Sequence, residues 1–225
     1  MTTKVSKKYI HAVIATDIVL FTIIDKELNV LLIKMNKAPY EGMWAAPGSL
    51  VQAEESIDDA AKRVLVEKSG IKNAYIEQLA TFGKVNRDPF GRVVSVAYLG
   101  IIPNPPVLLT TTEEHREVNW FPVKKLPSLA YDHKEIIKEA YERLKSKLAY
   151  TNIATHIVPD EFTLSDLQLT YEIVLGKELD KRNFRKKLFE VKLVKKTGKL
   201  DIGKAHRPAE LYRFVSREQK NVEIL

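Results

Sequence analysis

The sequence contains no cysteine among its 225 residues. This absence excludes disulfide bonds, thiolate metal sites and a cysteine nucleophile, and it fits a cytoplasmic protein. Long apolar runs are also absent, because the longest, AVIATDIVLFTII, is interrupted by Asp17 and is too short to span a bilayer. The basic start, MTTKVSKKY, is not followed by a cleavable apolar segment. We therefore expect a soluble, cytoplasmic protein with no membrane partner.

Net positive charge is absent from most of the chain and concentrated in one segment. The whole chain has a net charge of +7. Between Lys177 and Arg213 there are 13 Lys and Arg against 5 Asp and Glu, a net charge of +8, so all other residues sum to −1. Such a segment is typical of a surface that binds a polyanion.

The first two thirds of the chain show strand patterns with two helices. The runs HAVIATDIVLFTII, NVLLIKMN, AYIEQLATFGKV and RVVSVAYLGII are β-branched or alternating. Ser56 and Asp59 form an N-cap pair before an apolar stripe that ends at Gly70, which predicts a helix. A second helix is predicted at roughly 132–148. The expected class is α+β.

The pattern changes after the aperiodic stretch TNIATHIVPDEF, which we interpret as a connection. Thr163 with Asp166 caps a predicted helix that ends at Gly176, and Asp180 caps a second helix, KRNFRKKLFEV. A strand, a Gly-containing basic loop and a second strand follow, as in the wing of a winged helix. We predict domains at 1–152 and 153–225.

The second helix of this pair has an apolar stripe and a basic outer face. At 100° per residue, Phe184, Leu188 and Val191 fall on one side. Arg and Asn side chains read base edges and Lys neutralises phosphate, so this face is typical of a recognition helix. A solvated surface helix is the alternative, which the flanking helix and wing disfavour. The expected DNA-binding residues are Lys181, Arg182, Asn183, Arg185, Lys186, Lys187, Lys199, Lys204, His206 and Arg207.

The stretch APGSLVQAEESIDDAAKRVLVEKSGI resembles the Nudix box, which reads G, five residues, E, seven residues and REUXEEXGU, where U is aliphatic. Three defining positions differ, because Ser49 replaces Gly, Val64 replaces Glu and Lys68 replaces Glu. Glu55, Arg63 and Glu67 match the motif. An ordinary amphipathic helix after a loop is the alternative, but MWAAPGS before it and FPVKKLPSLAYDHKEII after it also resemble the Nudix fold.

The altered positions bear on catalysis. In the full motif, carboxylates on one helical face hold Mg²⁺ against a pyrophosphate. Here that face offers Val64, Glu67 and Lys68, and the lysine places a positive charge where the dication would bind. We expect hydrolysis to be absent or vestigial, with no catalytic residues, no bound metal and no cofactor. Arg63 and Glu67 are expected to serve helix packing and pairing.

Both halves together resemble the Nudix-related transcriptional regulators of the NrtR family. The segments NRDPFGRVVSVAY, LAYDH, FTLSDLQLTYEIVLGKELDKRNFRKKL and HRPAELYRF carry this resemblance over nearly the whole chain. It implies a Nudix-fold domain, an α/β/α sandwich with a mixed sheet, followed by a C-terminal winged helix-turn-helix domain. It also implies a homodimeric repressor that binds palindromic operator DNA and responds to an effector, ADP-ribose or a sugar such as arabinose.

A sensing cleft is expected to use polar groups near the former substrate end. The candidate effector-binding residues are Trp44, Glu55, Arg87, Asp88 and Arg92. A guanidinium binds phosphate and a carboxylate binds sugar hydroxyls. The loop charges could instead pair with each other, and Trp44 could be a core aromatic. Asp132 and His133 are better explained as a helix N-cap and a first-turn residue.

Two rival functions remain open at this stage. One is an active Mg-dependent Nudix hydrolase of ADP-ribose-like substrates with an accessory nucleic-acid-binding domain. The other is a general nucleic-acid-binding module without a metabolite, whose affinity would depend steeply on salt but little on sequence. The effector, the operator and the sign of regulation are not specified by the sequence.

Overall fold

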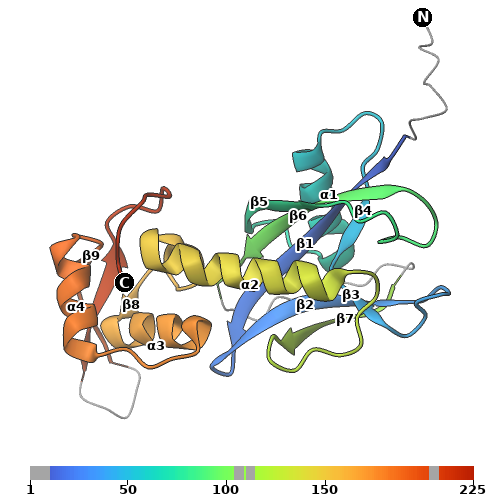
Figure 1. Ribbon diagram of the computed structural model, residues 1–225. Helices are drawn as coiled ribbons and strands as arrows, with labels where there is room; N and C mark the ends of the chain where they lie inside the picture. Colours follow the sequence, from blue (N-terminus) through green and yellow to red (C-terminus); the bar gives the residue numbers. More distant parts are fainter. Residues whose placement is uncertain (1–10, 104–108, 110–114, 203–207) are drawn as a thin grey trace, which may run out of the picture. The chain divides into compact units, whose positions relative to one another are not determined.

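The computed structural model describes residues 11–103, 109, 115–202 and 208–225 (Figure 1). The first two thirds of the chain form a seven-stranded sheet with the order β3-β2-β1-β6-β5, in which β4 also pairs with β1 and β7 with β2. The strands are β1 (Val13–Ile24), β2 (Glu27–Met35), β3 (Trp44–Ala45), β4 (Gly48–Leu50), β5 (Tyr75–Phe82), β6 (Val93–Ile101) and β7 (His115–Pro122).

The sheet is mixed, as predicted. β1 pairs antiparallel with β2 and with β4. Val13 N–H donates to the Arg92 carbonyl near one end of β1, and Ile102 N–H donates to the Phe21 carbonyl nearer the other. Residue numbers rise together along both chains, so β1 and β6 run parallel. The central strands are almost wholly apolar, because both of their faces are buried.

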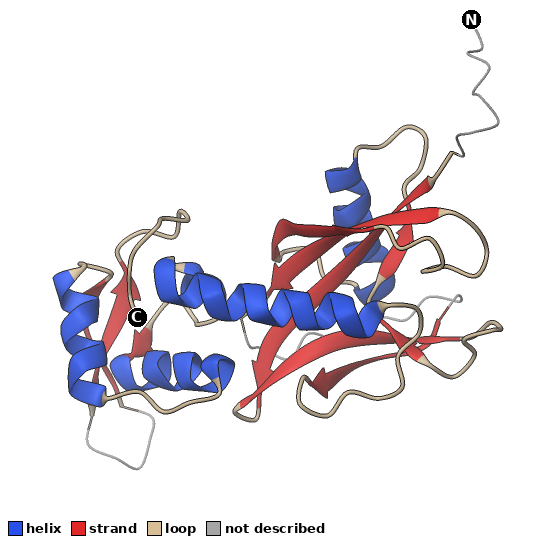
Figure 2. Ribbon diagram, viewed as in Figure 1, coloured by secondary structure: helices blue, strands red, loops and turns tan. Residues whose placement is uncertain are grey.

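Two helices accompany the sheet, α1 (Ile57–Ser69) and α2 (His133–Tyr150), and Figure 2 shows them on opposite faces of it. The predicted caps of α1 are confirmed. Ser56 accepts a hydrogen bond from Asp59 N–H, and Gly70 adopts a left-handed φ of 74°. On the buried side of α1, Ala60, Ala61 and Val64 are each 0% exposed. These residues dock α1 on the protein core.

The C-terminal part is a winged helix. Helices α3 (Leu164–Leu175) and α4 (Lys181–Glu190) are followed by strands β9 (Val194–Asp201) and β10 (Ala209–Phe214), and the short β8 (Phe162–Thr163) completes a sheet in the order β8-β10-β9. The predicted caps are again present: Thr163 and Asp166 form a full capping box, and Asp180 caps α4. Phe184 packs edge-on against Tyr171 with ring centroids 5.0 Å apart.

The segment interpreted as a connection is more ordered than its sequence indicated. It contains a 3-10 helix, η1 (Ile153–His156), in which Ile153 and Ala154 are 0% exposed. The chain divides into two compact units, and the division passes through β1, β2 and α2, since Phe21–Val30 and Tyr141–Leu225 belong to the second unit. The domain boundary at residue 152 stays a prediction. In the described part of the chain, no helix combines the length and apolar character that a membrane crossing requires.

Candidate functional site

A buried cluster of charged side chains lies where β1, the 84–92 loop and the start of α2 meet. Arg87, with a side chain only 3% exposed, donates to Asp132 at 2.7 and 3.0 Å and to Asp17 at 3.1 Å. Burial by itself would lower the pKa of Arg87, but the hydrogen bond to Asp132 and the charge of Asp17 outweigh it, so the pKa is raised. The guanidinium therefore stays charged between two carboxylates.

Asp17 organises the other side of this cluster. Its carboxylate accepts from Ser95 Oγ at 2.6 Å and lies 3.5 Å from His133 Nε2. His133 Nδ1 accepts from the Ala46 N–H at 2.9 Å, which leaves the proton of a neutral ring on Nε2, facing Asp17. Burial lowers the pKa of His133 despite the nearby Asp17 and Asp132 carboxylates. His133 is accordingly a neutral donor.

The β4 strand approaches this cluster very closely. Gly48 lies directly opposite Asp17 in the β1–β4 register. A Cβ atom on Gly48 would be 2.1 Å from Asp17 Oδ1, so no larger residue fits there without displacing the carboxylate. Gly48 thus places the chain leading to α1 against the charged cluster.

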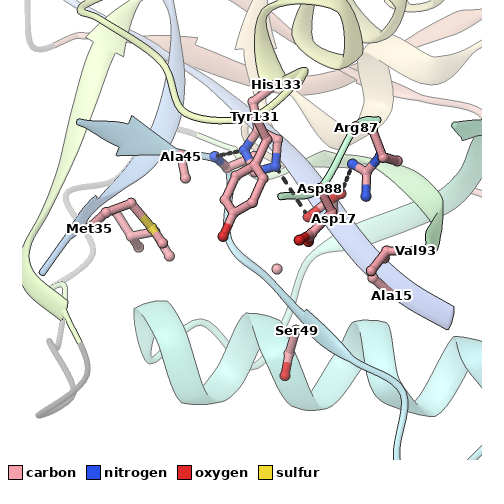
Figure 3. Close-up of a pocket in the computed structure, with 13 residues that line it drawn as sticks. Ala15, Asp17, Met35, Ala45, Ser49, Arg87, Asp88, Val93, Tyr131 and His133 are labelled. Carbon is pink, nitrogen blue, oxygen red and sulfur yellow. Dashed lines mark hydrogen bonds and ion pairs between the residues drawn. The ribbon is translucent and has the colours of Figure 1, made fainter. Parts of the chain in front are cut away.

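A cavity of about 130 Å³ opens beside the cluster (Figure 3). Asp17, Arg87, Asp88, Tyr131 and His133 supply its polar lining, together with Ser49 from the start of the Nudix-like stretch. Figure 3 shows the Tyr131 hydroxyl pointing toward the open space that Met35 and Ser49 also border. Tyr131 has a left-handed φ of 53° and packs on Tyr40 with ring centroids 4.3 Å apart. A strained aromatic is thus held at the cavity wall.

The predicted effector-binding residues separate into two groups. Arg87 and Asp88 line the cavity, whereas Trp44, Glu55 and Arg92 do not. Trp44 packs edge-on against Phe121 at 4.5 Å, and Arg92 donates to the carbonyls of Gly83 and Lys84, which shapes its own loop. The role of all five residues in binding an effector stays a prediction.

One arginine of the Nudix-like helix, Arg63, engages the two glutamates that match the motif. Arg63 donates to Glu55 at 2.6 and 2.9 Å and to Glu67 at 2.9 Å, which confirms the pairing expected for Arg63 and Glu67. The hydrogen bonds from Arg63 lower the pKa of Glu55 to about 2. Both carboxylates are therefore already paired with Arg63.

The residues at the motif's metal-ligand positions do not fit Mg²⁺. Val64 is 0% exposed and offers no oxygen, while Lys68 is 7% exposed and cationic. Only Glu67 supplies an oxygen ligand, and its carboxylate is paired with Arg63. Within the described residues, no group of three or more His, Asp or Glu side chains is placed to hold a metal ion.

A second candidate surface lies on α4. Phe184 is 3% and Leu188 0% exposed on the inner side, so the other side of the helix faces outward as predicted. That outer face presents Lys181, Arg182, Asn183 and Lys186, all of which are exposed. Arg185 and Lys187 flank it, with Arg185 donating to Ser165 Oγ at 3.2 Å. The arrangement suits insertion of a helix between nucleic-acid backbones.

The wing residues are only partly described. Lys199 on β9 is exposed and forms an ion pair with Glu161 at 2.8 Å. Lys204, His206 and Arg207 lie outside the described residues. Lys195 and Arg213, which the sequence analysis did not select, lie directly opposite each other on β9 and β10 and are both exposed.

Several residues of the charged cluster and of the cavity beside it were not selected from the sequence. Asp17 was noticed only as a break in an apolar run, and a lone carboxylate inside a buried strand is a usable signal for a paired or functional acid. Ser95 and Tyr131 left no such signal. Asp132 does precede α2, but its carboxylate binds Arg87 and its backbone carbonyl accepts from Glu135 and Ile136.

Two family descriptions match the chain in succession. Residues 14–144 match the Nudix domain, and residues 154–214 match the NrtR DNA-binding winged helix domain. An "ADPR responsive transcriptional repressor NtrR" from Acinetobacter baylyi is 34% identical over 214 residues, which are 93% of this chain and 85% of that protein.

Two solved structures are similar to parts or all of the chain. The crystal structure of Shewanella oneidensis NrtR complexed with a 27mer DNA has a TM-score of 0.75 and 32% identity, covering 89% of this chain and 93% of that one. The Nudix domain of the same protein complexed with ADP-ribose has a TM-score of 0.55 and 33% identity, covering 63% of this chain and 94% of that one.

Proposed function

Because the chain belongs to the NrtR family of Nudix-related transcriptional regulators, we propose that it is a transcriptional repressor whose operator binding is controlled by ADP-ribose. The winged helix would bind palindromic operator DNA as part of a homodimer. The Nudix domain would bind the effector and carry out no hydrolysis. ADP-ribose is preferred to a sugar such as arabinose, since the repressor relative responds to ADPR and a related Nudix domain binds ADP-ribose.

The observation that carries the DNA-binding part is the outer face of α4. Four exposed polar or basic residues lie on the side of α4 opposite the buried apolar residues that hold the helix in place. Arg182 and Asn183 have the chemistry to read guanine and adenine edges, while Lys181 and Lys186 have the chemistry to neutralise phosphates. A sequence-specific regulator requires both kinds of contact, to base edges and to phosphates.

The cavity supports the effector part of the proposal. At about 130 Å³ it is smaller than the ~300–1,000 Å³ of pockets that enclose a whole drug-sized ligand. It therefore has room for one sugar or phosphate group of ADP-ribose, with the rest of the molecule outside. Asp88 and the Tyr131 hydroxyl are groups that could bind ribose hydroxyls, whereas the Arg87 guanidinium is already paired with Asp17 and Asp132.

The helix α1 supports the absence of hydrolysis. Pyrophosphate cleavage in the Nudix box depends on a divalent cation that stabilises the developing charge. Val64, Lys68 and an Arg63-bound Glu67 do not provide that coordination. No hydrolytic step is therefore assigned to these residues.

The proposal is tested by two measurements on the purified full chain. First, DNA is selected in vitro for binding, and its affinity is measured with and without ADP-ribose. An allosteric coupling of ~1–3 kcal/mol would change that affinity about 5- to 150-fold. Second, ADP-ribose turnover is measured with Mg²⁺, where we expect background rates. An unchanged DNA affinity with ADP-ribose would refute the effector, and rapid Mg²⁺-dependent turnover would favour the rival hydrolase.

A further inference from the structure

Residues 216–225, which we name the C-terminal strap, follow the last wing strand and lie beyond the part of the chain that matches the winged helix domain. Instead of leaving the winged helix, the strap returns to the end of α2. Val222 N–H donates to the Tyr150 carbonyl at 2.8 Å, and Ile224 N–H donates to the Ala149 carbonyl at 2.7 Å. The last turn of α2 has unsatisfied carbonyls, and the strap satisfies two of them.

The side chain of Asn152 holds the other end of the strap by hydrogen bonds. Its side chain donates to the carbonyls of Ser216 at 3.2 Å and Glu218 at 2.8 Å, and accepts from Lys220 N–H at 2.7 Å. Asn152 is only 2% exposed, so these three bonds are partly buried. One side chain thus uses its donor and acceptor groups to fix a segment 64 to 68 residues further along the chain.

The strap also contacts the recognition helix. Ile224, at 2% exposed, lines a cavity of about 380 Å³ whose α4 lining is Asn183, Phe184, Lys186, Lys187 and Glu190. Glu223 lies 4.0 Å from Lys187. Since most other strap residues are exposed, Ile224 is its main apolar anchor. The strap therefore connects the end of α2 with the side of α4 that carries Lys187 and borders this cavity.

We propose that the strap and Asn152 are positioning elements that hold α4 on α2, and so set the placement of the recognition helix on DNA. This inference rests on the proposed DNA-binding function. Its basis is that the strap bonds to the last two carbonyls of α2, those of Ala149 and Tyr150, and that Glu223 lies 4.0 Å from Lys187 of α4. A movement of the C-terminal end of α2 would therefore reach α4 through the strap.

Comparing the affinity for a palindrome with the affinity for random DNA distinguishes an effect on the position of α4 from an effect on charge. Non-specific affinity depends on the number of phosphates neutralised, whereas binding to a palindrome also requires that two recognition helices match the half-site spacing. Asn152→Ala and Ile224→Ser remove no positive charge. Loosening the strap should therefore weaken specific binding and leave non-specific binding nearly intact.

The test uses the full chain, the palindromic duplex selected by the unmodified protein and a random duplex of equal length. We expect Asn152→Ala and Ile224→Ser to lower affinity for the palindrome by about 10-fold and for the random duplex by less than about 2-fold. Asn29→Ala is the matched control, because Asn29 is also buried and donates to two carbonyls, those of Ile24 and Glu27. It and the conservative Ile224→Val should bind both duplexes normally.

A palindrome affinity for folded Asn152→Ala equal to that of Asn29→Ala would overturn the proposal. If Asn152→Ala does not fold, hydrogen exchange of the unmodified protein decides: amides of Val222 and Ile224 should be protected as strongly as those in α4, and unprotected strap amides would contradict the strap's role. A wild-type protein without an ADP-ribose response would refute the effector only, since the duplex affinities judge the strap independently.

Discussion

Arg87 and Asp132 form a buried two-point ion pair, with guanidinium nitrogens 2.7 and 3.0 Å from the two carboxylate oxygens. Asp132 immediately precedes α2, so this pair ties the 84–92 loop to the start of that helix. Lys84 and Glu135 make a second, exposed link between the same elements at 2.6 Å. The buried pair is expected to matter far more, because exposed ion pairs contribute little.

Replacing Arg87 by Ala is predicted to destabilise the protein strongly. The change leaves Asp17 and Asp132 in a buried site without their common cation, and such losses cost about 3–5 kcal/mol. Urea unfolding measures the difference. The control is Arg92→Ala, which removes hydrogen bonds to two exposed loop carbonyls and should cost about 1 kcal/mol. Equal effects of the two substitutions would show that the buried pair has no special role.

His133 predicts a loss of stability in mild acid. Burial lowers its pKa below the ordinary value of 6.5, with Asp17, Asp132 and Arg87 as its charged neighbours. In the window from about pH 6.5 down to the lowered pKa, the unfolded chain binds a proton that the native ring does not. The contribution of His133 to the free energy of unfolding is therefore fully present above about pH 6.5. Below that pH it falls, by at most about 1.4 kcal/mol per pH unit.

His133→Gln isolates this contribution, because its amide oxygen can still accept from the Ala46 N–H. The difference in unfolding free energy between wild type and variant should shrink as the pH is lowered from 7.5 to 5. Other titrating groups are common to both proteins and cancel in the difference. A difference that is independent of pH would mean that His133 is not neutral in the folded protein.

For Tyr171, in contrast to Arg87, removal of the polar group is predicted not to destabilise the protein. Its ring is 0% exposed, and its hydroxyl has no hydrogen-bond partner among the described residues. Burial raises the pKa of this hydroxyl, so it stays protonated and unpaired. Tyr171→Phe keeps the edge-on contact with Phe184 and should leave stability unchanged or raise it by up to about 1 kcal/mol in thermal or urea unfolding. A loss of more than about 1 kcal/mol would indicate a bound water at the hydroxyl.

The predictions from sequence succeeded where local chemistry decides the structure. The Ser56, Thr163 and Asp180 caps each act within three residues, so the starts of α1, α3 and α4 were foreseeable. The cavity was not, because Asp17 and Ser95 are 78 residues apart and meet only when β1 and β6 lie side by side. Short strands such as β8 were missed for the same reason, since pairing with β10 defines them.

The roles of single charged residues were also hard to predict, because their partners are distant in the sequence. Arg87 was selected as a candidate phosphate-binding group, with pairing among the loop charges as the alternative, but its two carboxylate partners come from β1 and from the residue before α2. Nothing near Arg87 in the sequence identifies them. By contrast, the outer face of α4 follows from its own periodicity, and Arg182, Asn183 and Lys186 are exposed as predicted.

That outer face leads to a prediction about how DNA is read. Arg182→Ala should weaken binding to the selected palindrome by about 1–3 kcal/mol, because a base contact is lost, and should relax the preference at one base position. Lys192→Ala is the matched control, since Lys192 is also exposed and cationic but lies just beyond the C-terminal end of α4. Affinities for palindrome, single-base variants and random duplex are compared at one salt concentration, because the phosphate contribution varies with salt. If Arg182→Ala lowers all of these affinities equally, Arg182 contacts phosphate, and base reading must be assigned to Asn183 and its neighbours on α4.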